Sequence, residues 1–387
     1  MLGALLISAL TRYVRGSDSD YDDWASILND PSWSSSAIKP YMQMHQTLQL
    51  DEHRSENCTS PMCNLVADNH GTSGPIHTSF NTDFFPIESD LIRACAEVTG
   101  LIDRPLDPWS GDHLGFYNNL STISRIGANK GRRSYSARNY LEPNLDRPNL
   151  KVLCEAMAYG LEMHDDVVTG VNFSHAGNKF RVPATREVIL SAGSYGSPKL
   201  LELSGIGDVE VLRQANIDCK VELPAVGNNL NEHCMVVATY ELAPENVSLD
   251  VIHTPGFLEL AKKQYDESHD GPLTQGATTC GYFSWTSLAS NEEIRKTTEL
   301  VDQTPCTTMF YKRQLDTIAR HLEDPKAATL GVLLVPASCD QELAYGDPSQ
   351  IVSPAKRTSD KDMGISVFIP LQYPCSRGSV HVASNGK

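Results

Sequence analysis

Residues 193–207, GSYGSPKLLELSGIG, combine features of a place where a bound molecule can approach the backbone closely. An apolar run of strand length, 187–192, precedes them, and Gly193 permits a turn that a Cβ would hinder. Ser197 is a typical N-cap residue and Pro198 suits a first helical turn, so the run predicts a helix that begins at Pro198. The chemistry that such a strand, turn and helix would support is ligand binding at the turn.

Other patterns that could carry chemistry are incomplete. Gly205-Ile-Gly207 lacks the third glycine of a dinucleotide-binding turn, and GTSG at 71–74 lacks the Lys and the spacing of a phosphate-binding loop. The four carboxylates within 18–23 resemble a metal site, but they are more typical of a helix N-terminus, so we predict no metal site. GxSxG, HExxH and GKS/T do not occur in the sequence, which disfavours a hydrolase, a metalloprotease and an NTPase.

The run 193–207 matches, position by position, a signature of the glucose-methanol-choline (GMC) flavin oxidoreductases. Further segments are similar to that family, in the family's order: YVRGS at 13–17, DYDDW at 20–24, NHGTSGP at 69–75, GRRSYSA at 131–137, VGNNLNEH at 226–233 and SRGSVH at 376–381. The resemblance covers nearly the whole chain, and it is greatest to the fungal, aryl-alcohol or choline-dehydrogenase-like members.

This resemblance implies FAD as the cofactor and hydride transfer from the CH–OH group of an alcohol to the flavin, with a His as base. That His is expected beyond residue 387, so no catalytic residue is assigned in this chain. Four residues are carried over as cofactor contacts: Gly3, Arg12, Ala158 and Gly193. The family's amino-terminal GxGxxG turn does not occur in the sequence, so we expect a chain truncated at both ends that carries little flavin when purified.

Five histidines are candidates for the missing base, and none is convincing. His233 closes the segment VGNNLNEH, where the family's His is structural, and His381 is interpreted as a core or edge residue of a strand. For His45, His70 and His77 we favour exposed polar loops, with a substrate-channel role as the alternative.

The charge of the chain limits the classes of molecule that it is expected to bind. The 48 acidic residues outnumber the 32 basic ones, which gives a net charge of −16, and with no basic cluster this argues against nucleic acid and an anionic membrane. A small-molecule alcohol is the expected partner, and the oligomeric state stays open.

The first ten residues are apolar but lack the basic residues of a signal peptide, and they are too short to span a bilayer, which needs about twenty. A cytoplasmic and a secreted location both stay open.

The ten cysteines include no CxxC pair, so zinc and iron–sulfur sites have little support. Cys154 and Cys234 lie in apolar strand patterns, where a free thiol behaves as a small apolar group. Cys58 and Cys63 share a polar loop and could be bridged.

The pattern of apolar residues predicts both helices and strands. Helical spacing is found at 40–48 and 87–98 and dominates 251–323, and strands are predicted at 151–156, 167–173, 180–192, 235–242, 330–335, 364–373 and 378–383. These indicate an α+β fold of two domains, with an incomplete FAD-binding domain and a substrate-binding domain built on an antiparallel sheet. The resemblance assigns 1–48 to a remnant of the FAD-contacting segment, 49–148 and 244–387 to the substrate-binding domain, and 149–243 to the FAD-binding domain.

Three functions remain open from the sequence. The first is an FAD-dependent oxidase or dehydrogenase of primary or aromatic alcohols, impaired in this chain. The second is a non-catalytic GMC-like binding protein, and the third is a GMC-type cyclase without net redox chemistry. The missing parts favour the second for this polypeptide, and the intact signature favours the first for its lineage.

Overall fold

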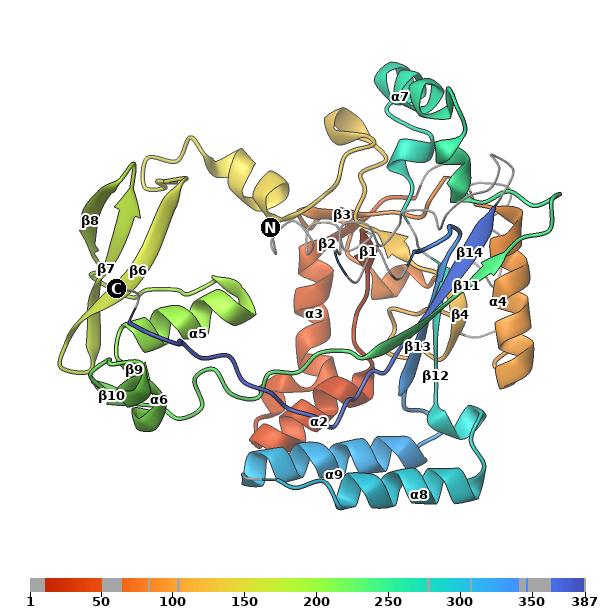
Figure 1. Cartoon of the computed structure of the whole chain (residues 1–387). Coiled ribbons are helices and arrows are strands. Elements are labelled where there is room, and N and C mark those ends of the chain that lie inside the picture. Colours follow the sequence, from red (N-terminus) through yellow and green to blue (C-terminus); the bar gives the residue numbers. More distant parts are fainter. Residues whose placement is uncertain are drawn as a thin grey trace. The chain divides into compact units, whose positions relative to one another are not determined.

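The chain divides into two compact units, each built from two separate stretches of sequence (Figure 1). This computed structural model describes residues 11–50, 65–82, 84–102, 105–276, 279–306, 308–340, 346 and 363–385. Unit 1 comprises Met1–Asn144 and His233–Tyr373, and unit 2 comprises Leu145–Glu232 and Pro374–Lys387. Helices and antiparallel strands together confirm the α+β class, whereas the four domain segments assigned from the resemblance stay a prediction.

Unit 1 is built on a five-stranded antiparallel sheet. Its strands, in spatial order, are β11 (Met235–Glu241), β14 (Gly364–Pro370), β13 (Leu330–Val335), β12 (Thr279–Phe283) and β4 (Gly115–Asn118). The predicted strands at 235–242, 330–335 and 364–373 are thus confirmed. β12 was missed, because its five residues lie within a stretch where helical spacing dominates.

Six α-helices belong to the described part of unit 1. They are α2 (Asp18–Leu28), α3 (Ser35–His45), α4 (Pro86–Thr99), α7 (Phe257–Ser268), α8 (Asn291–Asp302) and α9 (Met309–Glu323). The last two lie side by side (Figure 1), and the apolar stripe of α9 is buried at Leu315, Ile318 and Leu322. Among the described residues, none of the helices has both the length and the apolar character that crossing a membrane requires.

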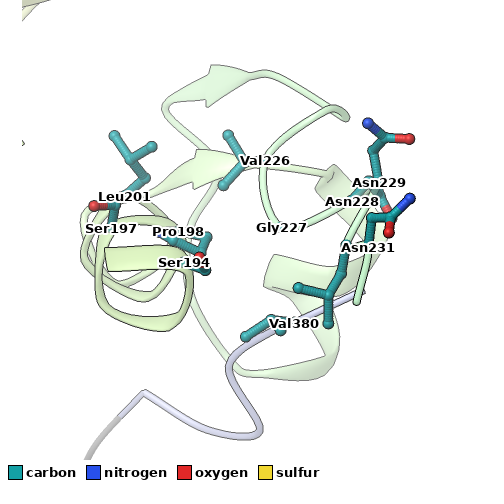
Figure 2. A pocket seen from close by; sticks show the side chains of 11 residues that line it. Ser194, Ser197, Pro198, Leu201, Val226, Gly227, Asn228, Asn229, Asn231 and Val380 are labelled. Atoms are coloured by element: carbon teal, nitrogen blue, oxygen red, sulfur yellow. The ribbon is translucent and has the colours of Figure 1, made fainter. Parts of the chain in front are cut away.

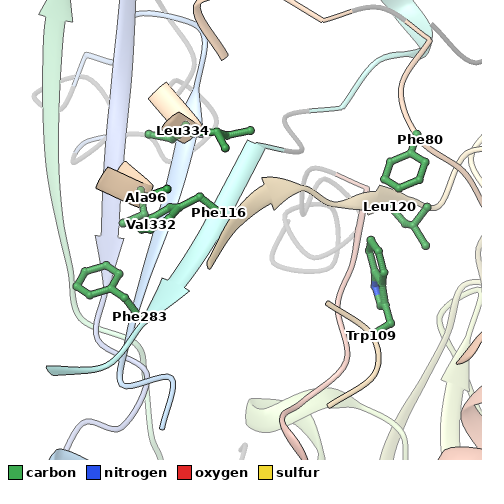
Figure 3. Packing of buried hydrophobic residues seen from close by; sticks show 9 residues of the cluster. Phe80, Ala96, Trp109, Phe116, Leu120, Phe283, Val332 and Leu334 are labelled. Atoms are coloured by element: carbon green, nitrogen blue, oxygen red, sulfur yellow. The ribbon is translucent and has the colours of Figure 1, made fainter. Parts of the chain in front are cut away.

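The main core of unit 1 lies between the sheet and α4. Ile92 and Ala96, one turn apart on α4, pack with Phe116, Phe283 and further buried residues of the sheet. Figure 3 shows Phe116, Phe283 and Val332 gathered there, with Phe80, Trp109 and Leu120 in the same cluster. This packing fixes the sheet from which the loops of unit 1 emerge.

Two short strand pairs complete unit 1. β1 (Arg12–Tyr13) is antiparallel to β5 (Leu120–Ser121), and β2 (Gln46–Leu48) is parallel to β3 (Ile76–Thr78). The second pair depends on glycine in the loop between its strands. A Cβ on Gly71 would lie 1.8 Å from the Gln43 carbonyl oxygen, so only glycine allows the loop to approach α3 this closely.

Unit 2 contains a three-stranded meander and the signature helix. Its elements are β6 (Ala156–His164), β7 (Val167–His175), β8 (Asn178–Pro183), α5 (Gly193–Leu203), β9 (Ile206–Gly207), α6 (Val209–Gln214) and β10 (Val221–Glu222). Leu161 of β6 and Leu200 of α5 share one small buried cluster, which joins the helix to the meander. Tight turns join the strands of the meander, at 165–166 between β6 and β7 and at 176–177 between β7 and β8.

Three strand predictions in this unit are wrong. The first strand begins at Ala156 and not at 151, and the third ends at Pro183. Val188 and Leu190 pack on the unit 2 cluster while Ile189 is 77% exposed, an alternation typical of a strand, but no described strand pairs with 187–192. A segment with alternating apolar residues does not form a β-strand unless a neighbouring strand pairs with its backbone N–H and C=O groups. For the same reason 378–383 is not a strand, and among the described residues it forms a single isolated bridge, between Leu230 and Gly378.

The start of the signature helix also differs from the prediction. α5 begins at Gly193, and Pro198 lies inside it. The Ser197 hydroxyl accepts a hydrogen bond from the Ala192 backbone N–H at 3.1 Å and does not cap a helix that starts after it. Pro198 is the sixth residue of this helix, so the Ser194 carbonyl, four residues earlier, receives no hydrogen bond from it.

Candidate functional site

A cleft of about 410 Å³ lies beside the signature helix in unit 2 (Figure 2). It is lined by α5, by the loop 226–231 and by one residue of the carboxyl-terminal segment: Ser194, Ser197, Pro198, Leu201, Val226, Gly227, Asn228, Asn229, Leu230, Asn231 and Val380. Figure 2 shows the side chains of the helix on one side and the asparagines of the loop on the other. Two segments that the sequence singled out separately therefore form one site.

Gly193 places the start of α5 next to this cleft. Its φ of +82° is in the left-handed region, which side-chain-bearing residues rarely adopt. A Cβ there would meet nothing within 4 Å, so backbone conformation and not space favours glycine. The turn thereby presents Ser194 and Ser197 at the cleft.

The carboxylate of Glu202 holds the carboxyl-terminal segment against α5. Its side chain is fully buried, and it accepts a hydrogen bond from His381 Nδ1 at 2.6 Å and from the Val382 backbone N–H at 2.8 Å. The interpretation of His381 as a structural residue agrees with this contact. The partner Glu202 was missed, because nothing in the sequence links residues 179 positions apart.

The loop 226–231 is tied to the same segment. The Val380 N–H donates to the Gly227 carbonyl at 2.7 Å, and Leu230 and Gly378 exchange two backbone hydrogen bonds at 2.9 and 2.8 Å. Gly227 has φ of +75°, and a Cβ on it would lie 2.3 Å from the Val380 carbonyl oxygen. Both strain and space therefore require glycine where the loop meets the segment.

The lining of the cleft suits binding more than acid–base catalysis. Hydroxyl groups, amide groups and backbone N–H groups at the start of α5 supply donors and acceptors, and Leu201, Val226 and Val380 supply apolar surface. Among the described lining residues none is titratable, so the cleft offers no general base of its own.

The predicted cofactor contacts fall in different parts of the chain. Gly193 and Ala158 both belong to unit 2, where Ala158 is an exposed residue of β6 paired with Phe173. Arg12 lies in β1 of unit 1, and Gly3 lies outside the described residues. The structure does not test these four contacts, and they stay proposals.

His70 lies in a buried polar cluster, so its prediction as an exposed loop residue is wrong. It is 6% exposed, its Nε2 lies 3.4 Å from Asp107 Oδ2, and its Nδ1 faces the side chain of Gln46. Burial acts to raise the pKa of Asp107, but hydrogen bonds led by those from His70 and Asn69 outweigh burial and hold that pKa below its usual value. These contacts also occupy His70, which argues against a role for it as a free base.

The other two histidines of the first third are half-buried. His45 ends α3 and contacts the Tyr140 hydroxyl through Nδ1 at 2.9 Å, and His77 lies in β3 with Nδ1 2.9 Å from the Ser124 hydroxyl. Burial lowers the pKa of both imidazoles. Neither is in an exposed loop, so that prediction is wrong for them as well.

The carboxylates of 18–23 lie at the start of α2, as predicted, and several of them also contact other side chains of the protein. Ser17 and Asp20 form a capping box at the helix start. Asp18 pairs with Lys39 at 3.0 Å, and Asp23 pairs with Arg320 and His321 at 3.0 and 2.6 Å. Within the part of the chain that the structure describes, no group of three or more His, Cys, Asp or Glu side chains could hold a metal ion.

The cysteines lie in varied surroundings. Cys154 and Cys234 are exposed and belong to no strand, so their prediction as strand residues is wrong. Cys58 and Cys63 lie outside the described residues.

Known proteins resemble this chain over its whole length but extend further. It is 36% identical over 403 residues to the dehydrogenase mpl7 of Monascus purpureus and to the dehydrogenase citC of Monascus ruber, and each match covers 100% of this chain and 62% of the relative. The chain thus spans less than two thirds of these relatives' length.

Solved structures share the fold. An FAD-dependent oxidoreductase from Chaetomium thermophilum matches with a TM-score of 0.81 at 24% identity, over 98% of this chain and 62% of that one. A fungal aryl-alcohol oxidase matches with a TM-score of 0.75 at 21% identity, over 96% and 61%. These likenesses confirm the predicted GMC-type fold. The sequence profile described as GMC oxidoreductase matches residues 9–235, more than half of the chain, and this protein therefore belongs to the GMC oxidoreductase family.

Proposed function

We propose that this chain belongs to an FAD-dependent oxidoreductase that acts on the CH–OH group of a primary or aromatic alcohol. Family membership supports the reaction class, and the fold of an aryl-alcohol oxidase supports the type of substrate. The observation that carries the proposal is the cleft that the signature helix α5 forms with the loop 226–231, because it joins both family segments in one binding site.

The donors of this cleft fit part of an FAD molecule. Its volume of about 410 Å³ is at the lower end of the ~300–1,000 Å³ typical of ligand pockets, so it accommodates one portion of a dinucleotide. Backbone N–H groups at the start of α5 and the amides of Asn229 and Asn231 would hold oxygen atoms of the cofactor. Gly193 permits the close approach, and Gly3, Arg12 and Ala158 are the further proposed contacts. When bound, FAD supplies the hydride acceptor.

An FAD titration followed by quenching of flavin fluorescence tests this binding. We expect little flavin in the purified chain, because it lacks a GxGxxG turn, and weak binding of added FAD at the cleft. Asn229→Asp places a negative charge on the lining without changing its size. About 1 kcal/mol of repulsion corresponds to a roughly 5-fold higher Kd for FAD.

Asn178→Asp, on β8 and outside the cleft, is the matched control and should leave the Kd unchanged. Equal Kd values for Asn229→Asp and the wild type, or no quenching by FAD, would contradict the proposed cofactor site. A stoichiometric flavin spectrum in the purified chain would refute the expectation of little bound flavin.

A second candidate is a non-catalytic GMC-like binding protein. One observation favours it: the described lining of the cleft contains no titratable side chain. Turnover of benzyl alcohol or choline by the chain with added FAD and a dye acceptor would refute this alternative. Flavin binding without turnover of either alcohol would support it.

A further inference from the structure

A buried carboxyl group joins three elements of unit 1 at the start of α4. Glu88 is the third residue of this helix and is 4% exposed. Its Oε2 accepts a hydrogen bond from the Phe85 backbone N–H at 2.6 Å, and its Oε1 is hydrogen-bonded to the Thr279 hydroxyl of β12. That hydroxyl also lies 2.7 Å from Asn118 Oδ1 of β4. We call Glu88, Thr279 and Asn118 the Glu88 cluster.

The Glu88 cluster lies where β4, the last of the five strands in spatial order, is attached to the sheet. Thr279 and Asn118 are directly opposite each other in the antiparallel pairing of β12 with β4. Each of these two residues is only 1% exposed. Because water does not surround the three side chains, they must satisfy one another's hydrogen bonds.

The number of protons in the cluster decides whether its hydrogen bonds are complete. A threonine hydroxyl carries one proton, but Thr279 Oγ1 has an oxygen of Glu88 on one side and Asn118 Oδ1 on the other. If the carboxyl group is ionised it supplies no proton, so one of these two contacts between oxygen atoms lacks a hydrogen. If Glu88 is protonated, it donates to Thr279, Thr279 donates to Asn118, and each contact has its own proton.

One other arrangement of hydrogen bonds is open to the cluster. With the oxygen and nitrogen of the Asn118 amide exchanged, Nδ2 would donate to Thr279, and Thr279 would donate to an ionised Glu88. This second arrangement keeps a full negative charge in the core of unit 1. The charges around Glu88 therefore decide between the two.

No positive charge compensates an ionised Glu88. Burial raises the pKa of this carboxyl group, and the hydrogen bonds from Thr279 and Phe85 oppose burial without outweighing it. Within the described ranges no charged side chain contributes to this pKa. A buried charge without a counter-charge is strongly unfavourable, so the surroundings favour the neutral acid.

The strands that face α4 bring no charge to the cluster. Successive residues of a strand point to opposite sides of the sheet, so Phe116 and Phe283 lie on the same side as the cluster and pack on α4. Burial raises the pKa of each titratable group on the described strands β4 and β12, and all are neutral: Tyr117, Cys280 and Tyr282.

The titratable groups of α4 itself do not compensate Glu88 either. Asp90 and Arg93 pair with each other at the exposed surface, at 2.6 Å. Burial raises the pKa of the Cys95 thiol, which is therefore neutral as well. Glu97 is exposed and would add a charge of the same sign.

We propose that Glu88 is held as the neutral acid and that its ionisation at alkaline pH loosens α4 and β4 from the sheet, so that the Glu88 cluster is a pH-sensitive element of unit 1. In the neutral state Oε1 donates to Thr279, and Oε2 accepts from Phe85. Ionisation releases the Oε1 proton to water and leaves a buried negative charge. This property does not depend on flavin binding, and it is separate from the proposed oxidation.

Urea unfolding of the full chain between about pH 5 and 9 tests the proposal, with Glu88→Gln as the comparison. Gln has the size of the neutral acid, and its oxygen and amide nitrogen can accept from Phe85 and donate to Thr279 in the same way. Because the folded-state pKa of Glu88 is raised, the folded state binds more protons than the unfolded state. This stabilisation is complete below about pH 4 and is lost as the pH rises through the folded-state pKa.

Relative to Glu88→Gln, the unfolding equilibrium constant of the wild type should therefore rise with pH, by up to about 10-fold per pH unit. Glu97→Gln, an exposed position on the same helix, is the matched control and should keep the pH dependence of the wild type. An unfolding constant that stays level or falls with pH relative to Glu88→Gln would overturn the proposal.

Infrared spectroscopy measures the proton of Glu88 in the folded chain. The wild type and Glu97→Gln should show the C=O stretching band of a protonated carboxyl group at neutral pH, and Glu88→Gln should lack it. The wild-type band should also disappear as the pH is raised, a measurement that does not need Glu88→Gln to fold. Absence of the band at neutral pH would overturn the proposal and assign the cluster to the ionised arrangement with the exchanged Asn118 amide.

Discussion

Replacement of Glu202 by Gln is expected to loosen one wall of the cleft beside α5 without unfolding the chain. The fully buried carboxylate accepts hydrogen bonds from His381 Nδ1 and from the Val382 N–H, at 2.6 and 2.8 Å. Gln retains the volume and one acceptor oxygen of Glu202, but its amide N–H₂ group would face either His381 Nδ1 or the Val382 N–H, both of which are donors. One of the two hydrogen bonds is therefore lost. One hydrogen bond to a charged group contributes about 1.5–3 kcal/mol, so we expect a local loss of about 2 kcal/mol.

Hydrogen exchange at the Val382 amide measures this loss directly. A loss of about 2 kcal/mol in the local opening free energy corresponds to roughly 30-fold faster exchange. Val380 should also exchange faster, because its N–H donates to Gly227 from the same segment. Amides of the unit 1 sheet serve as an internal reference and should not change.

Glu210→Gln is the control for this experiment. Glu210 pairs with Arg213 on the exposed surface of α6, where an ion pair contributes little, so it should leave exchange at Val382 unchanged. If Glu202→Gln changes exchange at Val382 by no more than Glu210→Gln does, Glu202 does not hold this wall.

Two further predictions concern unit 1. Gly71→Ala should strongly lower the melting temperature of the chain, because the new Cβ would lie 1.8 Å from the Gln43 carbonyl oxygen. Gly160→Ala is the control and should not lower it, because a Cβ there meets nothing within 4 Å. Equal melting temperatures of the two variants would refute this prediction. Burial acts to raise the pKa of Asp23, but hydrogen bonds led by that from His321 outweigh burial and hold the pKa below the ordinary value of 3.8. The folded state therefore binds fewer protons here than the unfolded state, so this stabilisation is complete above about pH 5 and is lost as the pH falls through the folded-state pKa. Urea unfolding between pH 6 and 3 should show a smaller acid-dependent loss of stability in Asp23→Asn, and an unchanged pH dependence would contradict this role.

Much of the fold could be predicted where apolar residues repeat and a partner element exists. β13 was predicted at its observed bounds, Leu330–Val335, and α4 to within one residue at each end. The run 187–192 has the same kind of pattern but no described partner strand, so the pattern alone was misleading. Periodicity reports which side chains are buried, and backbone pairing decides whether they form a sheet.

Individual side-chain partners could not be predicted from the sequence. His70 lies in a polar segment that predicts a loop, and in the structure it is buried beside Asp107, 37 positions further along the chain.

The sequence by itself determined the family, because the spacing of GSYGSPKLLELSGIG and of six further segments is a local property of the chain. It also identified Gly193 as the residue at which the backbone turns before α5. Only the tertiary structure decided that α5, the loop 226–231 and Val380 form one cleft, and that Glu202 joins them to His381. Local spacing determines which turns and helices form. The contacts that hold Val380 in this cleft, Glu202 with His381 and Gly227 with Val380, join residues more than a hundred positions apart, and they exist only when unit 2 has folded.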